Sequence, residues 1–216
     1  MTPHDAALRT REICALAPVV PVLVIEEVAH ARPLAEALVA GGLPALEVTL
    51  RTPCALEVIR AMAAVAGGVV GAGTLLTPAD VAAAKAAGAR FGVSPGATPA
   101  LLAAAEAEGL PLLPGAATAS EVMALLERGY DMAKFFPAAN IGGAPALKAL
   151  AGPLPQMTFC PTGGISAATA AEYLALPNVL CVGGSWVAPT PMVAQGDWAG
   201  IEALAKAASA LKPAGK

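Results

Sequence analysis

The sequence predicts an α/β protein that folds as one (β/α)8 barrel, the TIM-barrel architecture. Short runs rich in Val, Leu, Ile and Phe alternate along the chain with Ala- and Leu-rich segments, which is the pattern of parallel βαβ units. Eight such runs begin 20 to 26 residues apart, which leaves room for one helix and two short loops in each unit. A length of 216 residues suits one hydrophobic core, so we assign residues 1–216 to a single domain.

The order of the elements follows from these runs. The segment 5–16 is predicted as an extra amino-terminal helix, placed to close the bottom of the barrel. The eight strands are expected over residues 19–25, 45–50, 69–72, 91–94, 111–114, 132–136, 157–160 and 179–182.

Glycine and proline mark the ends of the helices between the strands. Helices over residues 34–40, 78–87 and 121–128 are each followed by glycine, the expected left-handed cap. Prolines that suit a first helical turn stand at Pro78, Pro99 and Pro145.

An open doubly wound sheet is the competing architecture. Gly71-Ala72-Gly73 follows the third predicted strand and is similar to a dinucleotide-binding turn. The third glycine of that motif is missing, because Leu76 stands in its place. Together with the count of eight units, this favours the barrel.

Composition and charge narrow the classes of partner. The net charge is -3 and the Lys and Arg residues are scattered, so no basic stripe is present for nucleic acid. Although 56% of the residues are hydrophobic, no apolar run approaches the ~18 residues that a membrane span needs. The amino terminus lacks a signal-peptide pattern. We therefore expect a soluble cytoplasmic protein that acts on small molecules.

The cysteines and histidines offer little for a metal centre. Cys14, Cys54, Cys160 and Cys181 are widely spaced and form no CxxC motif, and the chain has only two histidines. We expect no metal and no cofactor, and we interpret Cys160 and Cys181 as reduced core thiols. A metal-dependent aldolase needs several imidazole or carboxylate ligands, so carbon-carbon chemistry in this chain points to an amine catalyst.

Lys134 is the one lysine of six that falls in a predicted strand. Both faces of a barrel strand are buried, one against helices and one inside the barrel. Burial of an ammonium group without a partner is costly and favours the neutral amine, which is the nucleophile that Schiff-base formation needs. A lysine that reaches the barrel rim, or that forms a structural ion pair, is the alternative.

The second predicted strand carries one apolar and one polar face. Glu47, Thr49 and Arg51 alternate with apolar residues, so an acid, a hydroxyl and a guanidinium step toward the carboxyl-terminal mouth, where barrel enzymes keep their sites. Glu47 is the only carboxylate inside a predicted strand, and it suits the roles of partner to Lys134 and proton carrier. The alternative is that Glu47 and Arg51 neutralise each other.

Glycine-rich loops follow the last two predicted strands. Residues 161–166 and 183–186 each contain paired glycines, and loops after strands seven and eight of a barrel commonly bind phosphate. Thr74 and Ser94 put hydroxyl groups at the ends of strands three and four. Thr74 suits either a substrate carboxylate or a helix cap. The sequence thus predicts a phosphorylated substrate.

Six motifs follow one another along the chain. They are Glu-Val-Thr-Leu-Arg at 47–51, Gly-Ala-Gly-Thr at 71–74, Ser-Pro-Gly at 94–96, Lys-Phe-Phe-Pro-Ala at 134–138, Cys-Pro-Thr-Gly-Gly-Ile-Ser at 160–166 and Gly-Gly-Ser-Trp at 183–186. Together they closely resemble one enzyme family, the 2-keto-3-deoxy-6-phosphogluconate (KDPG) aldolases, which often also cleave 4-hydroxy-2-oxoglutarate (KHG). The resemblance runs in order from about Pro18 to Trp186 and into the tail.

The resemblance implies a homotrimeric barrel that reversibly cleaves KDPG to pyruvate and glyceraldehyde 3-phosphate, or KHG to pyruvate and glyoxylate, without a metal. It makes Lys134 the Schiff-base lysine and Glu47 the general acid and base. The substrate-binding residues that it implies are Arg51 and Thr74 for the carboxylate of pyruvate, Pro95 and Phe136 for the walls of the pyruvyl pocket, and Thr162, Gly163, Gly164 and Ser185 for the phosphate end.

One position departs from the family pattern. Ala139 stands where family members commonly carry glutamate, which bears on the shape and charge of the loop after the sixth strand. Two other functions fit the same residues. In a sugar-phosphate isomerase or epimerase, Glu47 acts as a base and Lys134 as an electrostatic stabiliser, whereas a non-catalytic protein only binds phosphorylated acids.

Overall fold

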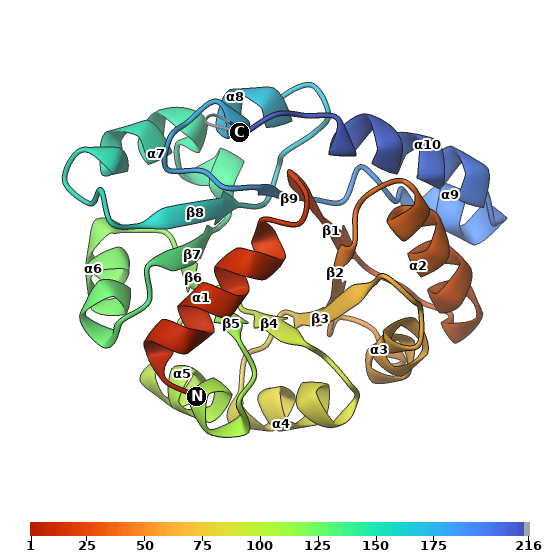
Figure 1. The fold of residues 1–216 in the computed structure, drawn as a ribbon, viewed down its shortest axis with the longest axis horizontal. Coiled ribbons are helices and arrows are strands. Elements are labelled where there is room, and N and C mark those ends of the chain that lie inside the picture. Colours follow the sequence, from red (N-terminus) through yellow and green to blue (C-terminus); the bar gives the residue numbers. More distant parts are fainter. Residues whose placement is uncertain (214–216) are drawn as a thin grey trace.

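A closed ring of parallel strands forms the centre of the computed structural model, which describes residues 1–213 (Figure 1). The prediction of a single domain over residues 1–216 extends beyond this range, since residues 214–216 lie outside the described part. The strands are β1 (Val19–Leu23), β2 (Ala45–Thr49), β3 (Val69–Gly73), β4 (Phe91–Val93), β5 (Leu112–Leu113), β6 (Gly115–Ala116), β7 (Met132–Phe135), β8 (Thr158–Pro161) and β9 (Val182–Gly184).

Two hydrogen-bonded sheets make up this ring. One runs β5-β4-β3-β2-β1-β9 and the other β6-β7-β8, and all their strand pairs are parallel. Bridges from Phe159 to Val179 and from Thr162 to Gly183 join β8 to the β9 segment. On the other side, the chain passes from β5 to β6 through Pro114 alone. Since β5 and β6 are two parts of one strand, the ring has eight positions and the predicted (β/α)8 barrel is confirmed.

Helices surround the ring on its outer side (Figure 1). Short 3-10 helices η1 (Val28–His30) and η2 (Ala138–Ile141) follow β1 and β7. The α-helices of the outer layer are α2 (Ala31–Ala40), α3 (Ala55–Ala63), α4 (Pro78–Ala86), α5 (Pro99–Glu108), α6 (Ala119–Arg128), α7 (Gly143–Ala151), α8 (Ala170–Leu174), α9 (Thr190–Gln195) and α10 (Trp198–Ser209).

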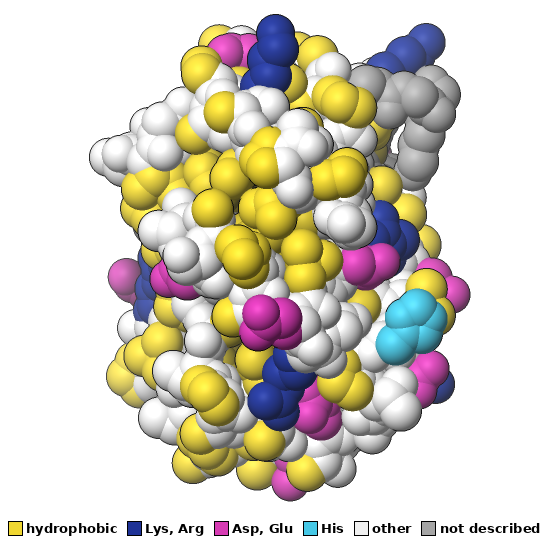
Figure 2. All heavy atoms as spheres, turned by 90° about the vertical axis from the view of Figure 1, so that its left-hand side faces the viewer, with side chains coloured by type: hydrophobic (Ala, Val, Ile, Leu, Met, Phe, Trp, Pro, Cys, Tyr) yellow, Lys and Arg dark blue, Asp and Glu magenta, His cyan; other side chains and the backbone are white. Residues whose placement is uncertain are grey.

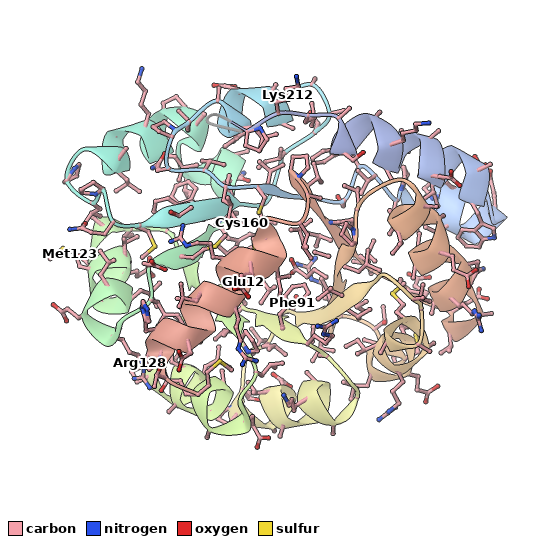
Figure 3. The ribbon with its side chains drawn as sticks, in the orientation of Figure 1. Glu12, Phe91, Met123, Arg128, Cys160 and Lys212 are labelled. Atoms are coloured by element: carbon pink, nitrogen blue, oxygen red, sulfur yellow. The ribbon has the colours of Figure 1, made fainter. Side chains whose placement is uncertain are left out.

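The extra helix α1 (Pro3–Cys14) lies across the amino-terminal end of the barrel, as predicted (Figures 1 and 3). It begins two residues before the expected start because the Thr2 hydroxyl caps it, accepting a hydrogen bond from the Asp5 N-H at 3.1 Å. The Thr10 hydroxyl donates to the carbonyl of Leu112 at 3.3 Å, which ties α1 to β5. The inner core that α1 covers consists of Cys14, Val20, Ala45, Phe91, Val93, Leu113, Met132, Cys160 and Cys181.

Two predicted strands differ in the structure by more than a shift of one or two residues at an end. The strand expected over 111–114 is interrupted, because Pro114 has no N-H to continue the ladder. The strand expected over 179–182 is displaced to β9, which pairs with β1 only from Val182 onward. Glycines 183 and 184, interpreted as loop, are therefore strand residues.

One predicted helix cap is also different. Gly41 follows α2 with a right-handed φ of -74°, and the left-handed turn comes one residue later at Gly42, with φ of 89°. The caps after α4 and α6 are as expected, since Gly88 and Gly129 have φ of 96° and 102°.

The outer surface mixes charges with apolar groups. Figure 2 shows the face that carries α6 and α7, where basic and acidic side chains are interspersed among apolar ones. None of the helices in residues 1–213 combines the length and hydropathy needed to span a lipid bilayer.

Candidate active site

Lys134 and Glu47 form an ion pair inside the barrel. The Lys134 ammonium nitrogen Nζ lies 3.1 Å from Glu47 Oε1, and the two side chains are only 6% and 4% exposed. Lys134 comes from β7 and Glu47 from β2, so strands that are far apart in the sequence deliver the pair. Each charge offsets the desolvation of the other, which keeps an amine and a carboxylate in contact away from bulk water.

Gly73 provides the space for the Glu47 carboxylate. A Cβ at position 73 would lie 2.7 Å from Cγ and 2.9 Å from Cδ of Glu47, closer than ordinary contact. Gly73 is the last residue of β3, the neighbour of β2. The close packing of the Gly73 backbone against the Glu47 side chain therefore directs the Glu47 carboxylate toward Lys134.

The other polar groups of β2 have separate partners. The Thr49 hydroxyl donates to the carbonyl of Leu23 at 2.9 Å, so it is satisfied within the barrel wall. Arg51 lies beyond the end of β2, where its Nε donates to the Thr74 hydroxyl at 3.4 Å. Among residues 1–213 the salt-bridge partner of Glu47 is Lys134, which answers the alternative that Glu47 and Arg51 neutralise each other.

Thr74 has an uncommon backbone at the end of β3. Its φ of 63° is left-handed, and it is the only residue other than glycine with positive φ in the described chain. Such a conformation costs ~1–3 kcal/mol and is found most often at functional sites. The strain places the Thr74 hydroxyl beside Arg51 at the carboxyl-terminal mouth.

Phe136 and Pro95 both lie near the lysine. The ring centre of Phe136 is 5.3 Å from Lys134 Nζ, within cation-π range. Gly115, the register partner of Lys134, has no side chain, and its open side is filled by the backbone of Pro95. The structure thus places Phe136 directly after the strand of the lysine and Pro95 against the neighbouring strand β6.

The loops after β8 and β9 meet at the same mouth. Gly163 and Gly164 have left-handed φ of 100° and 74°, so both need glycine. A Cβ on Gly163 would touch the Phe136 ring at 3.3 Å, which places this loop next to the ring that contacts Lys134. Thr162 is 6% exposed, and its side chain fills the space over Gly183 in β9. Ser185 follows β9 and is exposed.

Ala139 lies directly against the loop after β8. Its N-H donates to the Gly163 carbonyl at 3.0 Å, and a Cβ on Gly164 would come within 2.6 Å of the Ala139 Cβ. The next helix, α8, begins only at Ala170, so the donors nearest the glycines are loop N-H groups rather than a helix terminus. Position 139 therefore shapes the mouth with a small, uncharged side chain.

Sequence reasoning missed three positions of this region. Gly73 and Gly183 have no side chain, which leaves room for the side chains of Glu47 and Thr162, respectively. Cys160 is the register partner of Lys134 across β7 and β8. The alternation of side chains along the strand indicates that Cys160 points into the barrel, but its height along the barrel axis depends on the register between neighbouring strands. Among residues 1–213 the His, Cys, Asp and Glu side chains form no group of three or more that could hold a metal ion.

Comparison with known proteins decides the family. The model of the KDPG and KHG aldolase family matches residues 10–204. The chain belongs to this family. Relatives include the 2-dehydro-3-deoxy-phosphogluconate aldolase of Zymomonas mobilis, 57% identical over 92% of this aldolase and 94% of the relative, and the KHG/KDPG aldolase of Escherichia coli, 51% identical over 88% and 90%.

Solved structures agree with the barrel of this aldolase. The KDPG aldolase from Zymomonas mobilis superimposes with a TM-score of 0.90 at 56% identity, over 95% of this chain and 98% of that one. The KDPG aldolase from Legionella pneumophila, with pyruvate captured as a covalent carbinolamine intermediate, has a TM-score of 0.90 at 49% identity, over 93% and 98%. The protein is an aldolase, a carbon-carbon lyase, as the motifs predicted.

Proposed function

We propose that this aldolase cleaves KDPG reversibly to pyruvate and glyceraldehyde 3-phosphate through an imine on Lys134, and that it also cleaves KHG to pyruvate and glyoxylate. The observation that carries the proposal is the buried Lys134–Glu47 pair, an amine and a proton carrier in direct contact. The names of the relatives support the two substrates, and the carbinolamine of the Legionella enzyme supports covalent catalysis.

The geometry suits a sequence of four steps. Glu47 takes a proton from the Lys134 ammonium, Nζ adds as a neutral amine to the keto carbon, and Glu47 returns the proton as water leaves, which gives a protonated imine. This imine accepts the electron pair of the adjacent carbon-carbon bond when that bond breaks. Glu47 takes the proton of the substrate hydroxyl as the aldehyde forms, and then returns a proton to the enamine carbon. Hydrolysis releases pyruvate and restores the amine.

The surrounding residues hold the two ends of the substrate in this proposal. Arg51 and Thr74, joined by their 3.4 Å contact, bind the carboxylate next to the keto carbon. Pro95 and Phe136 form the walls of the pyruvyl pocket. The phosphate end lies against Thr162, Gly163, Gly164 and Ser185, whose hydroxyl and N-H groups donate to an anion without adding charge.

Assembly and location are part of the same proposal. We infer a homotrimer that acts in the cytoplasm, in the Entner–Doudoroff branch of carbohydrate metabolism, as the family resemblance implies. The four cysteines are free thiols, which suits a reducing compartment. Sedimentation analysis of the purified aldolase tests the trimer, and a monomer at working concentration would contradict it.

Borohydride trapping tests the imine. The aldolase is incubated with pyruvate and sodium borohydride, and the digested protein is mapped by mass spectrometry. We expect a reduced pyruvyl adduct on the peptide that contains Lys134. The variant Lys134→Met should lose the adduct and turnover, while the control Lys148→Met, which changes an exposed lysine of α7, should keep both.

The alternative reactions give other outcomes. An isomerase or epimerase would convert a sugar phosphate without forming an adduct, and a binding protein would retain the ligand without turnover. Turnover of KDPG by a folded Lys134→Met variant would refute the role of the lysine.

A further inference from the structure

Val22 of β1 lies beside the Glu47 carboxylate on the inner face of the barrel. Val20, two residues earlier, belongs to the inner core, and side chains alternate along a strand, so Val22 also points inward. Val22 is the register partner of Glu47 in β2, and neighbouring strands lie only ~4.8 Å apart. The two side chains are therefore neighbours at the same height of the barrel.

The buried cores leave Val22 uncovered. It is half-buried, whereas Pro21 and Leu23 on either side of it are buried. Within residues 1–213, Val22 is packed neither in the inner core nor in the larger core between the strands and the helices. Phe136, whose ring centre lies 5.3 Å from Lys134 Nζ, is also half-buried and outside both cores. Val22 is thus an apolar group that a molecule bound in the barrel can contact.

The ring of strands forms two arcs between Glu47 and Lys134. One arc runs from β2 through β3, β4, β5 and β6 to β7, and the other from β2 through β1, β9 and β8 to β7 (Figure 1). The first arc carries Thr74 after β3 and Pro95 after β4. In the proposed function these residues hold the pyruvyl half of the substrate, so that half lies on the side of β3 and β4.

Val22 lies in the second arc, between the Glu47 carboxylate and the proposed phosphate end. Ser185 follows Gly184, the register partner of Pro21, just as Val22 follows Pro21. Val22 therefore has Glu47 on one neighbouring strand and Ser185 at the end of the other. The part of the substrate that leaves as the aldehyde spans this interval, because its hydroxyl is at Glu47 and its phosphate at Ser185 in the proposed function.

We propose that Val22 determines which aldehydes this aldolase accepts, through apolar contact with the carbon chain between the reacting hydroxyl and the phosphate. The inference rests on the proposed function, which places the two ends of that chain. A valine side chain has no hydrogen-bonding group, so it selects by the space that it leaves. Glyceraldehyde 3-phosphate, from KDPG, fills that space, whereas the shorter glyoxylate, from KHG, leaves part of it empty.

The variant Val22→Leu tests this role, because it adds one methylene group to the side chain. The values of kcat/KM for KDPG and KHG are measured with the full-length aldolase by coupling pyruvate release to lactate dehydrogenase. We expect the ratio of KDPG to KHG to fall by ~10-fold or more, since one additional methylene in an apolar pocket changes discrimination by about that factor. Borohydride trapping of pyruvate on Lys134 should match the wild type, because pyruvate lies on the side of the other arc.

Two further variants complete the experiment. Val39→Leu is the matched control, since it makes the same change at a half-buried valine of α2 in the outer layer, and it should keep the wild-type ratio. Val22→Ala enlarges the space instead. It should raise the rate of condensation of pyruvate with erythrose 4-phosphate, relative to glyceraldehyde 3-phosphate, by ~10-fold, and it decides the question if Val22→Leu does not fold.

The outcomes separate the role of Val22 from the proposed function. A wild-type ratio of KDPG to KHG in a folded Val22→Leu variant, an equal fall in Val39→Leu, or an unchanged aldehyde preference in Val22→Ala overturns the role of Val22 and leaves the proposed function in place. Loss of pyruvate trapping in Val22→Leu, with equal loss of both cleavage reactions, overturns it as well, because the damage is then not confined to the aldehyde half. A wild-type aldolase that forms no pyruvyl adduct removes the proposed function and this inference with it.

Discussion

Replacing Gly73 with alanine tests whether the position of the Glu47 carboxylate controls catalysis. The backbone at Gly73 is not left-handed, so alanine fits its conformation. The new Cβ would lie 2.7 Å from Glu47 Cγ, whereas ordinary contact begins at 3.4 Å, so the side chain must retreat by about 0.7 Å or more. The 3.1 Å contact with Lys134 then lengthens beyond hydrogen-bond reach.

The expected loss is ~100-fold in kcat, about 2.7 kcal/mol, because a misplacement of ~1 Å costs about that much and general acid-base catalysis contributes ~100-fold or more. Imine formation depends on the Lys134 amine and should persist. Turnover is measured by coupling pyruvate release to lactate dehydrogenase, and imine formation by borohydride trapping.

The control for this change is Gly152→Ala, since a Cβ at Gly152 meets nothing within 4 Å and its φ is -66°. It should match the wild type in both assays. Wild-type kcat in a folded Gly73→Ala variant would refute the reasoning that Gly73 sets the position of Glu47.

Three further predictions concern substrate affinity and stability. Arg51→Ala should raise the KM for oxo-acid substrates by ~10-fold or more, because a charged hydrogen bond contributes ~1.5–3 kcal/mol; unchanged inhibition by pyruvate analogues would contradict this. Gly183→Ala puts a Cβ 2.9 Å from Thr162 Cγ2, so it should raise the KM for KDPG and leave pyruvate trapping intact; equal damage to both would argue against a phosphate role for Thr162. The hydrogen bond from Arg128 lowers the pKa of Glu106 below 4.5, so this carboxylate stabilises the fold above that pH and the stabilisation is lost as pH falls further. The urea concentration at the midpoint of unfolding should therefore fall as the pH is lowered below 4.5, and it should fall less steeply in Glu106→Gln. Identical pH dependence in the two proteins would exclude this contribution of Glu106 to stability.

Local patterns predict the barrel because each βα unit repeats the same signals. Lys134 stands out because both faces of a barrel strand are buried, so a charged residue in an apolar strand is buried on either face. The alternation of side chains along β2 directs Glu47 into the same barrel interior. Contact between Lys134 and Glu47 requires that both side chains point into the barrel. The roles of the surrounding residues stay predictions.

Features that depend on the register between distant strands are not visible in the sequence. Gly183 and Gly184 have poor strand propensity, yet they continue β9, where Thr162, directly after β8, bridges to Gly183 and fills the space over it. The inner core likewise brings Cys14, at the end of α1, into one cluster with Cys160 of β8, which no spacing between the two residues reveals. In both cases tertiary packing overrides local preference.

The side chains of the inner core, with α1 packed across them, close the amino-terminal end of the barrel, so substrate would enter and leave through the carboxyl-terminal mouth. In the proposed mechanism, pyruvate is bound covalently to Lys134 and the aldehyde half of the substrate lies between it and the mouth. We therefore expect ordered release: the aldehyde leaves first, and pyruvate follows only after hydrolysis. In the direction of synthesis the order reverses, so pyruvate binds first and the aldehyde second, and this order follows from the covalent bond together with a barrel that is closed at its amino-terminal end.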